Sequence, residues 1–218
     1  MVKKDYSIYI LLLFVFLAAL CYKKTTIKEF LSNRETPIIL AGDSIFENSN
    51  YVSRGKSVAD YLSVKHKNIV IVAKDGATLN QLIPQLKNIP KHLNTPSTRL
   101  FVSIGGNDIL LHFKGKVLIN KDEIKSMIEQ YKRIILHVKD KFNVTLYLTS
   151  IYYPTAQPCK RLHEVIKLWN DEQNKFAIKH NIKLFKIDNL LIQNKHFTNE
   201  IEPSEIGGKI IANAIENL

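Results

Sequence analysis

The chain is poor in cysteine, which limits what can hold its fold together. It contains two, Cys21 and Cys159, and the first lies in an apolar N-terminal stretch. We therefore expect no intradomain disulfide and a fold that rests on its hydrophobic core. The spacing of Cys and His typical of metal sites is also missing, so neither a metal nor an organic cofactor is expected. Cys159 follows a proline at an expected helix start, which favours a structural role over a catalytic thiol.

The sequence also lacks a concentrated basic run. Lys and Arg number 31 against 20 Asp and Glu, a formal charge of +11 that is compatible with a nucleic-acid or anionic membrane partner. However, the lysines are scattered, and no aromatic-basic motif accompanies them. The pattern favours solvated lysine faces over nucleic-acid binding. Hydrophobic residues make up 45% of the chain, which suffices for the core of one domain.

One long apolar stretch is present, at the N-terminus. Residues 7–22 are uncharged and mostly apolar, with lysines on both sides. The stretch is slightly short for a bilayer span of about 17–25 residues and near the upper limit of a signal-peptide core, about 15. We expect residues 1–24 to be a membrane-anchoring apolar helix, with a cleaved signal peptide and secretion as the alternative. Residues 25–36 are then a short tether.

Predicted strands and helices alternate after the tether. Short apolar runs typical of buried parallel strands occur at residues 38–41, 68–73, 100–104, 144–149 and 183–187. Helical patterns occur at residues 57–64, 79–89, 124–138, 161–180 and 205–217, the second of them interrupted by Pro84. The alternation predicts an α/β domain over residues 37–218, with helices on both faces of a five-stranded parallel sheet.

Three of these strands end in residues suited to catalysis. The first ends in Gly42-Asp43-Ser44, where a glycine permits a tight bend and the serine hydroxyl can enter a crevice. The second is followed by Gly76, which can bring a backbone N–H close to a bound group. The third ends in Gly105-Gly106-Asn107-Asp108, in which Asn107 offers a neutral donor suited to an oxyanion. Taken alone, the first two segments are better explained by turns and caps and the third is explained equally well by a turn, but together they favour one site at the sheet edge.

In their order these segments resemble the SGNH (GDSL) hydrolase superfamily, whose blocks read Gly-Asp-Ser, Gly and Gly-x-Asn-Asp. The resemblance extends over nearly all of residues 37–218 and implies a three-layer, flavodoxin-like α/β/α sandwich. It implies hydrolysis of a small-molecule or glycan ester through an acyl-enzyme on Ser44. It also implies an oxyanion hole made of the Ser44 N–H, the Gly76 N–H and the Asn107 side chain.

The last block of the superfamily, Asp-x-x-His, is altered in this chain. The corresponding stretch begins at Asn199 and continues as Ile201-Glu202-Pro203-Ser204, which puts Glu202 in place of the His and Asn199 in place of the Asp. A branch of SGNH-type proteins has a similar segment. Glu202 can act as a base only if its pKa rises toward neutral pH, and we expect Ile201, Pro203 and Ile206 to desolvate it. Capping of the last helix is the alternative role.

Two histidines are weaker candidates for the missing base. His196 lies on the same predicted loop as Glu202, and His112 follows the third block. Both are expected more readily as surface or helix residues.

Several polar residues are possible auxiliaries. Asp43, Asp108 and Asp188 follow strands and either contribute to the site or cap local turns, and Asn107 and Asn199 are candidates to hold the second oxygen of Glu202. Without a working base, the chain would be a pseudo-hydrolase that binds an acylated glycan or lipid. A third and weaker hypothesis is a scaffold lying on anionic lipid.

Overall fold

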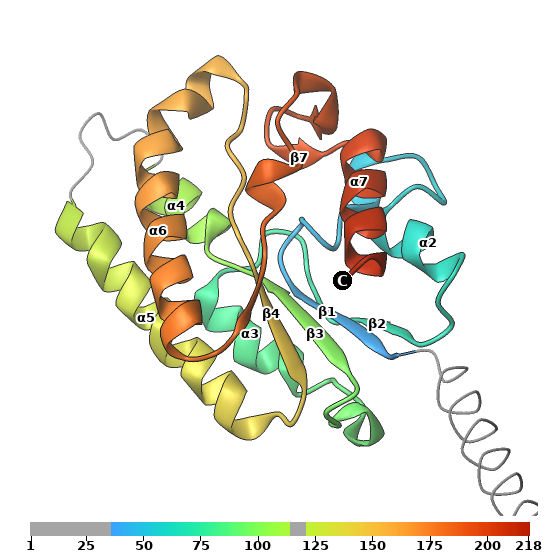
Figure 1. Ribbon diagram of the computed structural model, residues 1–218. Coiled ribbons are helices and arrows are strands. Elements are labelled where there is room, and N and C mark those ends of the chain that lie inside the picture. The colour runs from blue at the N-terminus through green and yellow to red at the C-terminus, as the bar shows by residue number, and fades with distance from the viewer. Residues whose placement is uncertain (1–35, 114–120) are drawn as a thin grey trace, which may run out of the picture. The chain divides into compact units, whose positions relative to one another are not determined.

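The computed structural model describes residues 36–113 and 121–218 (Figure 1). Residues 36–218 form one compact unit. The predicted anchor at residues 1–24, and the tether up to residue 35, lie outside the described residues. Within the described part of the chain, no helix is long and apolar enough to cross a membrane.

A five-stranded parallel sheet forms the centre of this unit, with the strand order β2-β1-β3-β4-β5. The strands are β1 (Ile38–Gly42), β2 (Ile69–Ile71), β3 (Arg99–Ser103), β4 (Thr145–Thr149) and β5 (Lys183–Phe185). All five predicted strands are thus confirmed. The strand β1 lies between β2 and β3, so the chain reverses its direction across the sheet there, and a crevice opens at the carboxyl ends of β1 and β3.

Helices cover both faces of the sheet (Figure 1). One face carries α3 (Leu79–Leu86), α5 (Lys121–Lys141) and α6 (His163–Lys179), and the other carries α2 (Val58–Ser63) and α7 (Glu205–Glu216). Successive residues of β1 explain this arrangement, because their side chains point to opposite faces of the sheet. Ile39 packs on the face covered by α3, α5 and α6, Ile38 packs on the face covered by α2 and α7, and both are fully buried. The predicted three-layer sandwich is confirmed.

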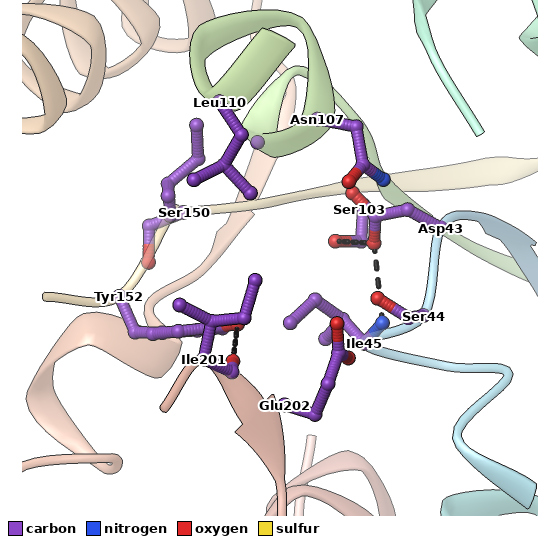
Figure 2. A pocket seen from close by; sticks show the side chains of 12 residues that line it. Asp43, Ser44, Ile45, Ser103, Asn107, Leu110, Ser150, Tyr152, Ile201 and Glu202 are labelled. Atoms are coloured by element: carbon purple, nitrogen blue, oxygen red, sulfur yellow. Dashed lines mark hydrogen bonds between the residues drawn. The ribbon is translucent and has the colours of Figure 1, made fainter. Parts of the chain in front are cut away.

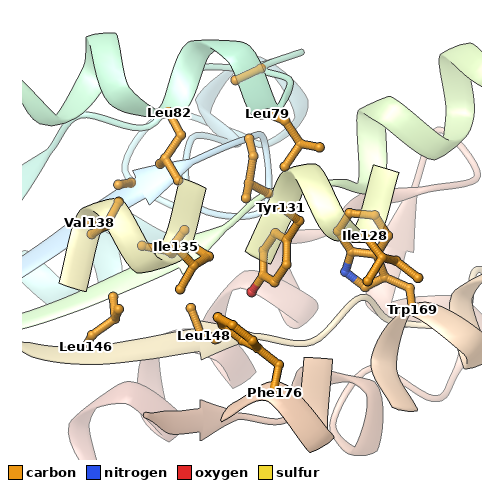
Figure 3. Close-up of a cluster of buried hydrophobic side chains, with 14 of the residues drawn as sticks. Leu79, Leu82, Ile128, Tyr131, Ile135, Val138, Leu146, Leu148, Trp169 and Phe176 are labelled. Carbon is orange, nitrogen blue, oxygen red and sulfur yellow. The ribbon is translucent and has the colours of Figure 1, made fainter. Parts of the chain in front are cut away.

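The larger core lies between the sheet and α3, α5 and α6, and it reaches the functional edge of the sheet (Figure 3). Tyr131 of α5 and Trp169 of α6 pack with ring centroids 5.2 Å apart. The Trp169 ring also lies against Gly105, where a Cβ atom would approach it to 2.3 Å. Gly105 has a φ of 110°, so both sterics and backbone conformation require glycine two residues after the end of β3.

Two local predictions were wrong. Pro84 does not interrupt a helix, because α3 runs continuously through it. Pro84 is exposed, so the carbonyl that loses its helical partner lies on the solvent side. Ile206, which was expected to help desolvate Glu202, is 48% exposed.

The sequence did not predict two short elements at the edge of the sheet. Helix α4 (Gly106–Phe113) starts in the third motif, so Asn107 and Asp108 lie in its first turn. Strands β6 (Phe197–Thr198) and β7 (Glu202–Pro203) form an antiparallel hairpin before α7. Both elements contribute to the site described below.

Candidate functional site

The predicted nucleophile lies in a pocket at the carboxyl ends of the central strands (Figure 2). The pocket brings together Asp43, Ser44, Asn107 and Glu202, which come from β1, α4 and the β6–β7 hairpin. In Figure 2, Asn107 and Glu202 lie on opposite sides of Ser44. The remaining lining residues are Ile45, Ser103, Gly106, Leu110, Ser150, Ile151, Tyr152 and Ile201.

A tight bend after β1 presents Ser44 to the pocket. Gly42 has a φ of 119°, and a Cβ atom there would lie 1.6 Å from the carbonyl oxygen of Ser103, so only glycine fits. The chain then enters a single turn in which the N–H of Phe46 donates to the Asp43 carbonyl at 3.2 Å. The Asp43 carboxylate caps this turn by accepting the Ile45 N–H at 3.2 Å. Ser44 therefore stands at the start of a turn, where backbone N–H groups lack helical partners.

Gln85 of α3 fixes the residue that precedes this bend. Its side-chain oxygen accepts the Gly42 N–H at 2.8 Å, and its amide nitrogen donates to the Gly42 carbonyl, also at 2.8 Å. Gln85 is itself buried. Both hydrogen bonds therefore form away from water, where an unmade bond is costly, and they hold the end of β1 in place.

Asp43 is a second buried carboxyl group beside the nucleophile. Its Oδ1 accepts the Ser103 hydroxyl at 2.9 Å. Burial raises the pKa of Asp43 to about 7, an effect that the hydrogen bonds from Ser103 and Ile45 oppose and that nearby Glu202 reinforces. Asp43 thus shapes the turn and adds a titrating group to the wall of the pocket.

The three donors predicted for an oxyanion hole come from three segments: the turn after β1, the turn after β2 and the first turn of α4. In the described residues, no hydrogen bond occupies the backbone N–H of Ser44 or of Gly76. Gly76 has a φ of 71° in the turn after β2 and is not among the lining residues, although it adjoins Ala77. The Asn107 amide donates one hydrogen to the Ala77 carbonyl at 3.1 Å. This bond fixes the amide orientation and leaves its second hydrogen for a ligand.

Asp108 positions this loop and does not line the pocket. Its carboxylate accepts the N–H of Leu79, the first residue of α3, at 3.0 Å. Burial raises the pKa of Asp108, and the hydrogen bond from Leu79 opposes the rise. Of the two roles expected from the sequence, the structure favours the one in loop geometry.

Glu202 lies on the first residue of β7 and is 7% exposed. Burial raises its pKa, a hydrogen bond with the Ser44 side chain lowers it, and the charge of Asp75 raises it. One carboxylate oxygen of Glu202, Oε2, is buried and has no hydrogen-bond partner in the described structure. The expectation that Asn107 or Asn199 holds this oxygen is therefore wrong. Of the expected desolvating residues, Ile201 lines the pocket and Pro203 is buried, whereas Ile206 is exposed.

The hairpin that carries Glu202 has an unusual backbone. Asn199 and Glu200 have φ values of 46° and 72°, in the left-handed region that few residues other than glycine adopt. After this turn, the Tyr152 hydroxyl donates to the Ile201 carbonyl (Figure 2). Burial holds the pKa of Tyr152 well above its usual value, so this hydroxyl stays a donor. The residue before Glu202 is thereby tied to the loop after β4.

Neither histidine lies in the pocket. The buried Nδ1 of His196 accepts the Ile192 N–H at 3.2 Å, so its ring serves the local backbone. His112 pairs with Glu123, with 2.7 Å between Nε2 and Oε2. Cys159 is buried as a free thiol, and burial raises its pKa, which disfavours the reactive thiolate.

Asp188 does not line the pocket, but it contacts a residue that does. Its carboxylate accepts the hydroxyl of Ser150, a lining residue, at 2.5 Å. No group of three or more His, Cys, Asp or Glu side chains among the described residues has the geometry to hold a metal ion.

Sequence reasoning missed several residues that shape the site. No role was predicted from the sequence for Ser103, Tyr152 or Gln85. For Ser103 a signal existed, because it ends the third strand, two residues before Gly105. The side chains of Gln85 and Tyr152 form hydrogen bonds with backbone groups of residues that are distant in the sequence, and no local sequence pattern reveals such bonds.

Comparison with known families finds one match. The family described as GDSL-like Lipase/Acylhydrolase matches residues 38–215. No curated protein matches the chain.

Several solved structures are similar to the chain. A lipolytic protein of the G-D-S-L family from Veillonella parvula is 19% identical, with a TM-score of 0.65 over 84% of this chain and 97% of that one. A GDSL-like lipase from Bacteroides thetaiotaomicron is 14% identical, with a TM-score of 0.61 over 89% and 95%. An acetylxylan esterase from Geobacillus stearothermophilus is 14% identical, with a TM-score of 0.62 over 84% and 93%. At these identities the likeness shows the fold.

Proposed function

The chain belongs to the GDSL-like lipase/acylhydrolase family, and from this premise we propose that it is a serine esterase with Ser44 as its nucleophile. The observation that carries the proposal is the convergence of the Ser44 hydroxyl, the Glu202 carboxyl group and the Asn107 amide in one pocket. Small acyl esters, including acylated glycans, are the proposed substrates. Similarity to an acetylxylan esterase supports this class.

In the proposed first step, Ser44 Oγ attacks the ester carbonyl carbon while its proton passes to Glu202. The carbonyl oxygen becomes an oxyanion, which the N–H groups of Ser44 and Gly76 and the free hydrogen of Asn107 stabilise. The tetrahedral intermediate then collapses: the bond to the alcohol oxygen breaks, and that oxygen takes the proton back from Glu202. The products are an acyl-Ser44 ester and a free alcohol.

The second step repeats this chemistry with water. Glu202 accepts a proton from a water molecule, whose oxygen attacks the acyl carbon, and the bond to Ser44 Oγ breaks as Ser44 regains a proton. A carboxylate is a weaker base than imidazole toward a hydroxyl group, so turnover is expected to be slow. Burial partly compensates, because it raises the pKa of Glu202 toward the range in which a base works well.

One observation favours a second candidate function, a pseudo-hydrolase that binds acyl esters without turnover. In a serine hydrolase triad, a third group orients the base. Here Glu202 Oε2 has no partner in the described structure, so no residue there performs that role. Such a protein would still use the donors around Ser44 to bind an ester carbonyl.

Hydrolysis of p-nitrophenyl acetate by the full chain and by Ser44→Ala separates the two functions. We expect the substitution to lower kcat by about 10³-fold or more, because the nucleophile is lost. Ser49→Ala is the matched control, since Ser49 is exposed and lies outside the pocket. Wild-type rates equal to those of Ser44→Ala, together with no acyl group on Ser44 by mass spectrometry, would refute the esterase and leave the binder.

The apolar residues 7–22 support a further part of the proposal, that the enzyme is held at a membrane by its N-terminal segment. Alkaline carbonate extraction of membranes tests it. The full chain should stay in the membrane pellet, and release of a shortened chain into the medium would instead favour a cleaved signal peptide.

A further inference from the structure

The proposed base, Glu202, lacks the partner that a catalytic base usually has. In a serine hydrolase triad, a third side chain binds the far side of the base and orients it. The Oε2 atom of Glu202 is buried and has no hydrogen-bond partner among the described residues. The placement of this carboxyl group therefore depends on the backbone that carries it.

The hairpin that carries Glu202 has few hydrogen bonds of its own. Strands β6 and β7 pair over two residues each, Phe197 with Pro203 and Thr198 with Glu202. Pro203 has no N–H, so it cannot donate to the neighbouring strand. Because a two-stranded hairpin is at best marginally stable by itself, groups outside it have to fix its position.

Two buried side chains bind the residues on either side of Glu202. The Tyr152 hydroxyl, from the loop after β4, donates to the Ile201 carbonyl. The Asn48 amide donates to the Pro203 carbonyl at 3.2 Å. Asn48 is fully buried, and Tyr152 is 7% exposed. The backbone of the base is thus held immediately before and immediately after Glu202, by bonds that form away from water.

Asn48 also belongs to the segment that carries the nucleophile. It follows Ser44 directly after the turn in which the Phe46 N–H donates to the Asp43 carbonyl. Its Oδ1 accepts the N–H of Val58, the first residue of α2, at 2.9 Å, so both the oxygen and the nitrogen of the amide are bonded. Asn48 therefore connects three segments: the turn after β1, the start of α2 and strand β7.

We propose that Asn48 is a positioning residue for the base. Because it joins the turn of the nucleophile to the residue after Glu202, it sets the separation of the Ser44 hydroxyl and the Glu202 carboxyl group. This is the task that the third member performs in a triad. Asn48 does not line the pocket, so it acts through Glu202 and not on the substrate. The inference rests on the proposed esterase function.

The start of α7 leaves room for the Asn48 amide. A Cβ atom added at Gly208, in the first turn of α7, would lie 3.3 Å from Asn48 Nδ2, which is tighter than most such contacts. Gly208 is helical, so alanine suits its backbone. A substitution there can therefore displace the Asn48 amide without removing any of its hydrogen-bonding atoms.

A double-mutant cycle between Asn48 and Glu202 tests the proposal. Asn48→Leu roughly keeps the side-chain volume and removes both hydrogen bonds. We expect it to lower kcat for p-nitrophenyl acetate by about 10–100-fold, because a displaced base transfers protons poorly. In a Glu202→Gln background, where the oxyanion donors sustain residual hydrolysis, the same substitution should change kcat by less than about twofold. Equal losses in both backgrounds would show a merely structural role and overturn the proposal.

Gly208→Ala is a second variant that decides the question if Asn48→Leu does not fold. Alanine favours a helix, so Tm should not fall. We nevertheless expect kcat to fall by about threefold or more, because the Asn48 amide is displaced, and we expect this loss to vanish in the Glu202→Gln background. An unchanged kcat in this variant would then overturn the positioning role.

Asn94→Leu is the matched control. The Asn94 side chain also accepts a backbone N–H, that of Asn143, at 2.7 Å, but it precedes β3 at the end of the sheet opposite the pocket. This variant should keep the wild-type kcat. Failure of the esterase itself would look different, since wild-type rates would equal those of Ser44→Ala. That outcome would refute the esterase and the positioning role together, whereas equal losses in the two backgrounds would refute the positioning role alone.

Discussion

The nucleophile and the proposed base are supported in different ways. Ser44 follows a central strand whose last residue is held by the buried Gln85, and the adjacent turn is capped by Asp43. Glu202 stands on a two-residue strand after a turn with two left-handed residues. Hydrogen bonds to its backbone hold this hairpin, including one that the Asn48 side chain donates to the Pro203 carbonyl at 3.2 Å. One oxygen of Glu202, however, has no partner in the described structure.

This difference indicates that the two halves of the site are preorganised to different degrees. The position of Ser44 follows from the sheet and from α3, and that of Asn107 from the start of α4 after β3, and these elements belong to the fold itself. The position of the base depends on a small hairpin added to that fold. Changes near Ser44 should therefore affect stability and activity together, whereas changes in the hairpin should mainly affect activity.

The largest effect is expected for Glu202→Gln. Loss of the base should lower kcat by about 10²–10⁴-fold while stability is retained, because the amide has nearly the same shape. In the wild type, kcat should rise with pH through the raised pKa of Glu202, since only the carboxylate accepts a proton. The variant should lack this rise. Glu205→Gln is the control, because Glu205 pairs with Lys56 on the surface; equal losses in both variants would contradict a catalytic role for Glu202.

Gln85→Leu should have the next largest effect, and here on stability. The substitution leaves the buried Gly42 N–H without an acceptor, which costs about 1–3 kcal/mol of unfolding free energy. Activity should fall as well, because Ser44 follows Gly42 by two residues. Urea denaturation measures the loss. Gln130→Leu, which removes an exposed hydrogen bond to Asn80, should cost less than about 0.5 kcal/mol.

Tyr152→Phe tests how the hairpin is held. The ring stays, and only the hydrogen bond to the Ile201 carbonyl is lost, at about 1 kcal/mol. We expect a loss of about tenfold in kcat, since Glu202 adjoins Ile201. Tyr147→Phe loses a bond from Lys183 at the far end of the sheet and should keep its kcat. A Tyr152→Phe enzyme with unchanged kcat would show that the hairpin is held without this bond.

The smallest effect is expected for Glu200→Gly. Glycine adopts the left-handed backbone without strain, so the variant should gain up to about 1 kcal/mol, or about 2–4 °C in Tm. Calorimetry measures the change, with Lys195→Gly as a control at a residue of ordinary φ on the same segment. A lower Tm for Glu200→Gly would mean that side-chain contacts of Glu200 outweigh the strain.

The sheet could be predicted because its strands are buried on both faces and read as continuous apolar runs. Ser44 and Asn107 could be predicted because they follow such runs directly. The hairpin could not, because strands of two residues carry no periodic pattern, and its turn uses Asn and Glu where glycine is the usual signal. The role of Gln85 also escaped prediction, because its partner Gly42 lies on another strand-and-turn segment 43 positions away.

Two carboxyl groups in one pocket would also influence how the proposed reaction ends. Hydrolysis of an ester releases a carboxylic acid, which ionises near neutral pH. The product anion would lie beside Glu202, close to Asp43, and like charges at short range repel strongly in a buried site. The incoming ester is neutral and meets no such repulsion. In the proposed esterase, this acidic wall would therefore promote departure of the product acid and keep the site open to new substrate.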